Sequence, residues 1–253
     1  MTGIIAGPGD RISSMLPIRD VNPTAIRPLV MWLIIAVNVV VFLRQPSSGP
    51  ELEEFIYEHA AIACEITTGE PLAAQEIRTG ICSDAPDSAV VFPRKSLPGS
   101  VVVSMFLHAG LAHIAFNLWS LWIFGNNVEE AFGHLGFAIF YLLSGIAATF
   151  GFVAVNPDLT VPLVGASGAI AAVMGAYLVL FPRHQIMTLI FFRIVAIPAK
   201  VFLGIWFFSQ FLFTDGSVAW EAHVAGFAFG VLVTLPFRRR LLRNTSTGSF
   251  GLA

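Results

Sequence analysis

The chain alternates long apolar runs with shorter polar connections, and this pattern sets the elements that the sequence predicts. A helix that crosses the hydrocarbon core of a bilayer needs about 20 predominantly apolar residues. The apolar runs predict six membrane-spanning helices: Leu29–Leu43 (starting near Ala25), Val101–Phe124, Leu135–Val155, Val161–Phe181, Ala199–Phe213 and Val218–Phe237. The apolar segment Ile186–Ile197 contains Arg193, so we expect it to lie at the membrane surface. The predicted fold class is an all-α polytopic membrane protein.

Composition excludes the other broad classes. Hydrophobic residues make up 56% of the 253 residues and charged residues 12%, whereas an average soluble domain carries about 25% charged residues. Such a chain has too few charges for a soluble globular protein and too many apolar residues for a disordered one. Its formal net charge of -2 provides no basic field for nucleic acid. The expected partner is therefore the lipid bilayer, and nucleic acid is excluded.

The distribution of basic residues predicts the orientation. If the N-terminus lies inside, ten of the fourteen Lys and Arg residues fall in cytoplasmic segments, so the positive-inside rule places both termini in the cytoplasm. We expect a cytoplasmic segment 1–27, a six-helix membrane domain 28–243 that includes the extracytoplasmic loop 45–99, and a disordered cytoplasmic tail 244–253. The first apolar run has no cleavage-like end and is predicted to be an uncleaved signal anchor.

The long polar loop after the first span holds both cysteines, Cys64 and Cys82. A disulfide between them is chemically permitted on the extracytoplasmic side, and two free thiols are the alternative. The pieces Glu51–Ile62 and Leu72–Thr79 have the pattern of short amphipathic helices that lie on the membrane or on the bundle.

Polar side chains in the second span are the first candidates for chemistry, because such groups are costly in lipid. His113 and Asn117 are four residues apart and share one helix face. His108 lies five residues before His113, about 140° around the helix, and cannot easily join them. For His113 and Asn117 the alternative is a purely structural hydrogen bond between helices, and for His108 the structural interpretation is favoured.

The fourth and sixth spans carry a serine and a histidine, each at the head of a stripe of small residues. The stripes are Ser167, Ala171 and Gly175 on the fourth span, and His223, Gly226 and Gly230 on the sixth. Small residues let two helices approach closely, which by itself is ordinary membrane packing. Close approach of these two stripes brings a hydroxyl within reach of an imidazole, as an activated nucleophile requires.

Three motifs in this order resemble those of the rhomboid intramembrane serine proteases. They are His108-x4-His113-x3-Asn117, Gly165-x-Ser167-Gly168 and Ala222-His223-x2-Gly226-x3-Gly230. The resemblance covers about Val101–Phe237 and implies a six-transmembrane-helix rhomboid-like bundle. Three positions depart from the family pattern: Gly99 and Ser100 stand where many members have a Trp-Arg pair, and Ala171 stands where some members have an aromatic that stacks on the histidine.

The resemblance also implies a role for each motif residue. Ser167 would be the nucleophile and His223 its general base, while the Ser167 backbone N–H, His113 and Asn117 would form the oxyanion hole. The remaining motif residues would be structural: His108, Gly165, Gly168, Gly226 and Gly230. The family works through a Ser–His dyad, without metal or cofactor, and Glu221 points elsewhere on its helix and is given no role.

The function that follows is that of a serine endopeptidase that hydrolyses peptide bonds in or near transmembrane segments. We expect single-pass membrane proteins as substrates, a bacterial plasma membrane as the location, and the loop Thr214–Ala219 as a cap over the site. Three alternatives stay open at this point. They are a catalytically silent rhomboid-like protein that binds transmembrane clients, a metalloprotease or metal transporter using His108, His113 and His223, and a channel or ordinary transporter.

Overall fold

The computed structural model describes residues 15–83, 88–212 and 219–245. Most of the predicted disordered tail, and the predicted capping loop apart from Ala219, lie outside these residues. Apolar helices form a bundle in the described part, and they are α2 (Leu29–Arg44), α7 (Leu111–Phe132), α8 (His134–Val155), α9 (Ser167–Leu180), α10 (Ala199–Ser209) and α11 (Trp220–Thr234). Helix α9 is central, because it contacts α7, α8, α10 and α11 and every residue from Gly168 to Tyr177 is buried.

Two helical segments of the described residues are long and apolar enough to cross a membrane. They are His134–Val155 and Trp220–Leu242, and the criterion is length and apolar composition alone. A third span results if Leu97–Phe106 and Leu111–Phe132 are counted together. Helices α2, α9 and α10 are apolar but shorter. The structure is thus mostly helical and suited to a membrane, while the count of six spans stays a prediction.

The predicted continuous helix Val101–Phe124 is wrong. The chain instead forms α6 (Leu97–Val103) and the 3-10 turn η1 (Ser104–Phe106), and then bends by 81° before α7 begins. Gly110 precedes α7 without a side-chain cap. The bend is fixed by Gln45, whose amide accepts from the His108 N–H at 3.3 Å and donates to the His108 carbonyl at 2.5 Å. These side chain-to-backbone bonds satisfy the groups that a continuous helix would have used.

The described residues also contain strands, so the all-α expectation needs correction. Strands β4 (Gln185–Ile190) and β5 (Arg193–Pro198) form an antiparallel hairpin, which β1 (Met15–Asp20) extends to the order β1-β4-β5. In β4, Ile186 and Thr188 are buried between less buried neighbours, which is the two-residue period of a strand. The predicted interfacial segment therefore forms two of the three strands of a small sheet.

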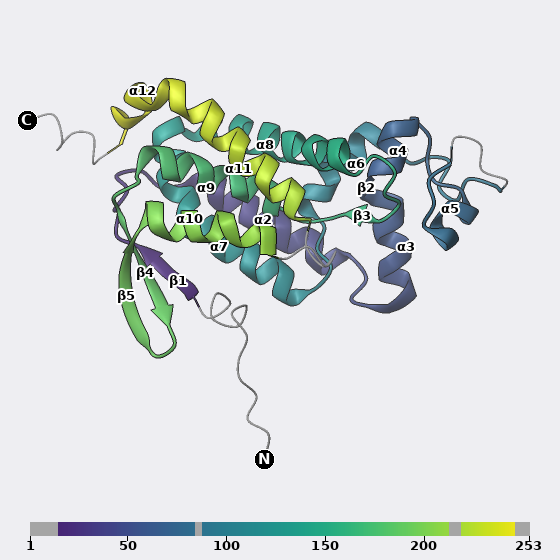
Figure 1. The fold of residues 1–253 in the computed structure, drawn as a ribbon, viewed down its shortest axis with the longest axis horizontal. Helices are drawn as coiled ribbons and strands as arrows, with labels where there is room; N and C mark the ends of the chain where they lie inside the picture. The colour runs from purple at the N-terminus through teal and green to yellow at the C-terminus, as the bar shows by residue number, and fades with distance from the viewer. Residues whose placement is uncertain (1–14, 84–87, 213–218, 246–253) are drawn as a thin grey trace, which may run out of the picture.

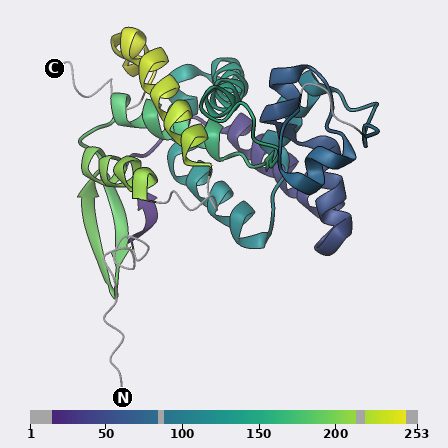
Figure 2. The same cartoon turned by 45° about the vertical axis from the view of Figure 1, so that its right-hand side comes forward.

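The sheet and the long loop lie at opposite ends of the bundle (Figures 1 and 2). At the sheet end, the partly buried Asp20 carboxylate accepts from the Tyr177 hydroxyl at 3.0 Å and from Asn127 Nδ2 at 2.6 Å. Burial raises the pKa of Asp20 to about 6, although these hydrogen bonds oppose the shift. Trp119 Nε1 donates to the Pro17 carbonyl at 2.6 Å. These contacts hold β1 against the bundle.

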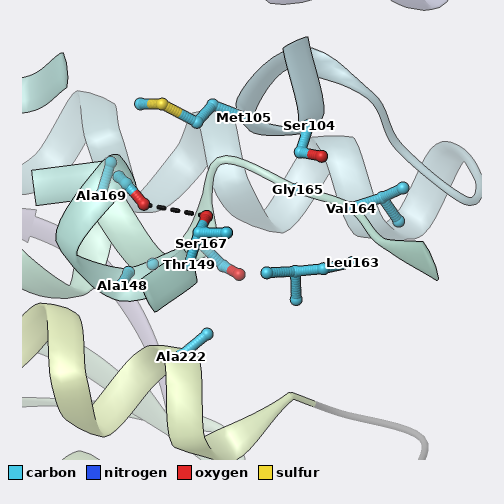
Figure 3. A pocket seen from close by; sticks show the side chains of 12 residues that line it. Ser104, Met105, Ala148, Thr149, Leu163, Val164, Gly165, Ser167, Ala169 and Ala222 are labelled. Carbon is cyan, nitrogen blue, oxygen red and sulfur yellow. Dashed lines mark hydrogen bonds between the residues drawn. The ribbon is translucent and has the colours of Figure 1, made fainter. Parts of the chain in front are cut away.

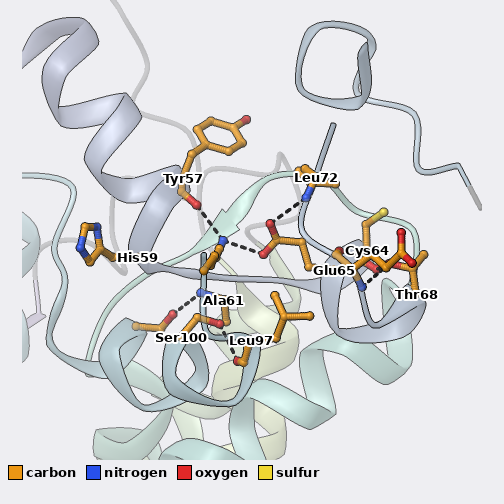
Figure 4. Close-up of polar contacts among 12 residues, drawn as sticks. Tyr57, His59, Ala61, Cys64, Glu65, Thr68, Leu72, Leu97 and Ser100 are labelled. Carbon is orange, nitrogen blue, oxygen red and sulfur yellow. Dashed lines mark hydrogen bonds and ion pairs between the residues drawn. The ribbon is translucent and has the colours of Figure 1, made fainter. Parts of the chain in front are cut away.

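The long loop folds into helices α3 (Gly49–His59), α4 (Ala63–Thr68) and α5 (Ala74–Thr79). Two of them overlap the predicted amphipathic pieces, and α4 was not predicted. Polar contacts around Tyr57 and Glu65 lie at their centre (Figure 4). Lys95 Nζ lies 2.6 Å from Glu65 Oε2 and donates to the Tyr57 carbonyl at 2.7 Å. Burial raises the pKa of Glu65 and lowers that of Lys95, and their ion pair opposes both shifts. Cys64 and Cys82 are joined by a disulfide.

This loop is attached to the segment that leads into α9. Strand β2 (Ala61–Ile62) pairs with β3 (Pro162–Leu163), and the Ala61 N–H donates to Ser104 Oγ at 2.6 Å. The Ser104 carbonyl in turn accepts from the Gly165 N–H at 2.9 Å. The loop therefore helps to fix the backbone immediately before Ser167.

Glu129 provides the start of α2 with the cap that its sequence lacks. Its buried carboxylate accepts from the N–H groups of Val30 and Met31, at 2.9 and 2.7 Å, and contacts His134 Nδ1. Glu129→Ala should therefore lower the free energy of unfolding by about 2–4 kcal/mol, because buried donors are left unpaired. Thermal unfolding in detergent measures this, with the exposed Glu54→Ala in α3 as the control. Equal melting temperatures for both variants would contradict the capping role.

Candidate active site

Ser167 lies at the first turn of α9, at the end of a short extended approach. The preceding Gly165 has φ +121°, a conformation that side chains rarely adopt. A Cβ at this position would lie 2.7 Å from His113 Nε2, so space as well as backbone requires glycine. Ala166 gives α9 no side-chain cap, and the N–H groups of a helix start have no partner within the helix. The Ser167 hydroxyl is thus presented beside free backbone donors.

His223 lies on α11, opposite Ser167. Its Nε2 is 2.7 Å from Ser167 Oγ, a hydrogen-bond distance. This contact depends on very close packing of the two helices. A Cβ on Gly226 would collide with the backbone of Gly168, and a Cβ on Gly230 with the backbone of Ala172. The two glycines of the sixth-span stripe therefore lie against Gly168 and Ala172, one residue after the predicted Ser167 and Ala171, and Gly175 lies against Phe227. This close approach of α9 and α11 brings hydroxyl and imidazole together.

His113 and Asn117 line the same cavity as this pair. The cavity has a volume of about 860 Å³ and is bordered by α7, α9, α11 and Trp206 of α10. Asn117 is 6% exposed, and its Nδ2 has no hydrogen-bond partner among the described residues. A buried donor without a partner is costly unless a ligand or water uses it. The two side chains are placed where they can donate to an atom bound beside Ser167.

His108 lies outside this cavity. It is fully buried in the bend before α7, and its Nδ1 lies 3.3 Å from the Phe106 carbonyl. Its ring meets the His113 ring edge-on, with centroids 5.1 Å apart. His108 thus packs behind His113, and Gln45, which the motifs do not include, holds its backbone.

A second, much smaller cavity of about 20 Å³ lies beside Ser167 (Figure 3). Small or slender side chains line it, among them Met105, Ala148, Thr149, Ala169 and Ala222. Its volume is close to that of one water molecule. It can accept a small group next to the serine but not a large one.

Two further residues contact His223. Gln210 Oε1, in the 3-10 turn η2 (Gln210–Leu212), lies 2.7 Å from Nδ1 of the imidazole. The Trp206 ring lies against it, with centroids 6.1 Å apart and planes at 35°. Sequence reasoning missed both. The available signal was the presence of a glutamine within an otherwise apolar run.

The part of the chain that holds this site matches a known protein family. A family model described as the Rhomboid domain matches residues 99–240, more than half of the chain. The chain belongs to the rhomboid family. This rhomboid is 32% identical over 148 residues to Rhomboid protease GluP of Bacillus subtilis. The matched region covers 56% of this chain and 28% of that protein.

Two other relatives match over slightly fewer residues, and one of them is a mitochondrial protein. Putative rhomboid protease YdcA of Bacillus subtilis is 31% identical over 137 residues, covering 53% of this chain and 64% of that protein. Rhomboid protein 1, mitochondrial, of Saccharomyces cerevisiae is 29% identical over 143 residues, covering 53% and 40%. This rhomboid thus spans less than two thirds of each of these relatives. Some of them are named proteases, and they come from bacteria and mitochondria.

Proposed function

We propose that this rhomboid is an intramembrane serine endopeptidase that works through Ser167 and His223. The observation that carries the proposal is the 2.7 Å contact between Ser167 Oγ and His223 Nε2. It lies at a cavity that His113 and Asn117 also line. A nucleophile, a base and polar donors that converge on one cavity are the parts that acyl transfer requires.

The proposed reaction uses each of these groups once. His223 Nε2 takes the proton of Ser167 as Oγ attacks the scissile carbonyl. The oxyanion that forms is stabilised by the Ser167 N–H, His113 and Asn117. His223 then donates its proton to the leaving amine, and water hydrolyses the acyl-enzyme with His223 again as the base. The cleaved peptide bond leaves a new carboxylate on the N-terminal fragment and a new amine on the C-terminal fragment.

The two cavities support a preference among substrates. A backbone in a transmembrane helix is fully hydrogen-bonded, so the segment must unwind before it is attacked. The cavity of about 20 Å³ beside Ser167 favours a small residue at the scissile bond. We therefore propose transmembrane segments of single-pass proteins, with small or helix-breaking residues near the cut.

The surrounding bundle is proposed to cross the membrane six times, with both termini in the cytoplasm. The end that carries Arg238, Arg239 and Arg240 would then face the cytoplasm, as the positive-inside rule requires. The folded loop with its disulfide would lie on the opposite side, where oxidation is permitted. A bacterial plasma membrane is the proposed location.

The alternative is a silent rhomboid-like protein that binds transmembrane clients. The hydrogen-bonded Ser167–His223 pair favours the protease, because binding alone needs neither group. The test is cleavage of model single-pass substrates in liposomes, with alanine or phenylalanine at the expected cut and with or without a chelator. Cleavage of the alanine substrate that is insensitive to the chelator supports the proposal. Binding of both substrates without cleavage overturns it in favour of the silent protein.

Removal of either proposed oxyanion donor should lower activity. His113→Ala and Asn117→Ala should each lower kcat by about 10- to 1000-fold with a smaller change in KM, because the donors act mainly on the transition state. Ser120→Ala is the matched control, since Ser120 lines the same cavity from the same helix. Steady-state kinetics measure the effect. An unchanged kcat in either variant removes that residue from the oxyanion hole.

A further inference from the structure

Both ring nitrogens of His223 have a hydrogen-bond partner, and the partner of Nδ1 affects what Nε2 can do. Nε2 faces Ser167 Oγ, and Nδ1 faces Gln210 Oε1, each at 2.7 Å. A neutral imidazole carries one proton, so one nitrogen donates and the other accepts. Nε2 can take the serine proton only if the ring proton is on Nδ1. The group that faces Nδ1 therefore decides whether His223 can act as a base.

The orientation of the Gln210 amide follows from its other hydrogen bonds. Its Nε2 donates to the Trp206 carbonyl at 3.0 Å and to Ser209 Oγ at 3.3 Å. Ser209 Oγ uses its own proton on the Trp206 carbonyl, at 2.6 Å, so it can only accept from Gln210. The opposite amide orientation would place oxygen against two acceptors. The network thus fixes Oε1, which only accepts, toward His223.

Burial makes this arrangement rigid. Gln210 and Ser209 are each 6% exposed, and the Trp206 ring lies against the imidazole. In some rhomboids an aromatic residue one helical turn after the serine stacks on the histidine, but this chain has Ala171 at that position. The ring that packs against the imidazole is therefore that of Trp206, near the end of α10.

We propose that Gln210 is a positioning residue that holds His223 as the Nδ1–H tautomer, with Nε2 free toward Ser167. The proposal rests on the proposed protease function. A neutral amide is suited to this place, because a buried carboxylate would carry a large desolvation cost. The groups that contact His223 or line its cavity include two titratable side chains, His113 and Glu221, and several neutral polar ones: Ser167, Gln210, Asn117, Ser120 and Asn156. Among them, Gln210 contacts Nδ1.

Two readouts test the proposal, and one of them does not depend on activity. In the full chain with ¹⁵N-labelled histidine, in detergent micelles, the His223 signals are assigned by their loss in His223→Ala. We expect a protonated Nδ1 and an unprotonated Nε2 in the native chain, and a mixture of tautomers in Gln210→Met. The exposed Gln75→Met in α5 should leave the signals unchanged. A native chain with the proton on Nε2, or an unchanged tautomer in Gln210→Met, overturns the proposal.

Kinetics provide the second readout. Gln210→Met should lower kcat by about 10- to 100-fold with KM changed less than about threefold, as expected when a base loses its orientation. Unchanged kcat in a folded Gln210→Met chain overturns the proposal. If the native chain cleaves nothing, the protease function fails, while the tautomer measurement still decides the role of Gln210.

Discussion

Alanine at position 167 should abolish peptide-bond cleavage while leaving the chain folded. Ser167 Oγ is 2.7 Å from His223 Nε2 and is the nucleophile in the proposed reaction. Loss of a serine nucleophile typically costs at least about 10⁴-fold in kcat, because the remaining donors and binding contacts cannot replace it. His223→Ala should cost about as much, and the double variant no more, since the two residues act as one unit.

The measurement is cleavage of a single-pass substrate in liposomes by each variant, with thermal unfolding as the check of folding. Ser120→Ala is again the matched control, because it removes a hydroxyl from the wall of the same cavity. It should retain kcat within about twofold, as expected for a group outside the reaction. Cleavage by Ser167→Ala at near-native rates would show that another group performs the reaction.

Valine at position 226 should damage stability and activity together. A Cβ on Gly226 would collide with the backbone of Gly168, the residue after the proposed nucleophile. Backbone lies on that side, so no flexible side chain can yield and α11 must move away from α9. Overpacking of this kind costs about 1–3 kcal/mol or more. A displacement of about 1 Å between reacting groups can cost 100-fold in rate, so kcat should fall at least that far.

Gly204→Val is the control for this substitution. Gly204 lies in α10, and a Cβ there would have no neighbour within 4 Å. Its melting temperature and kcat should therefore remain close to native values. A Gly226→Val chain with native stability and activity would contradict the close approach of α9 and α11.

The positions of the main helices could be predicted from the sequence because lipid imposes a simple rule on apolar length. The run Leu135–Val155 agrees with α8, His134–Val155, and Leu29–Leu43 agrees with α2. The rule fails where a side chain replaces helical hydrogen bonds. The bend before α7 depends on Gln45, which is 63 residues from His108 in sequence. No local pattern reveals such a contact.

The sheet was missed for a related reason. Segment Ile186–Ile197 is apolar, and an apolar run near a membrane does not by itself separate a helix from a strand. Its partner β1 is about 170 residues away along the chain and carries few strand signals of its own. Pairing between these distant segments, rather than local propensity, makes this region a sheet.

The candidate site was better specified by the sequence than the fold around it. Ser167, His223, His113 and Asn117 stand in short motifs with helical spacing, so their shared faces follow from geometry. The structure brings these residues to one cavity. Gln210 could not be placed in this way, because its role depends on where α10 ends and η2 begins, and on the hydrogen bonds with Trp206 and Ser209. Contacts between elements, and not spacing, determine it.

Whether His223 activates Ser167 as a nucleophile is tested most directly by covalent labelling, which requires no knowledge of the substrate. A fluorophosphonate reagent forms an Oγ–phosphorus bond with an activated serine and loses fluoride, while the base takes the proton. Peptide mapping of the folded native chain should locate the adduct on Ser167, insensitive to a chelator. Ser167→Ala and His223→Ala should both lose it. A native chain that remains unlabelled, or an adduct that persists in His223→Ala at the native rate, would contradict the proposed pair.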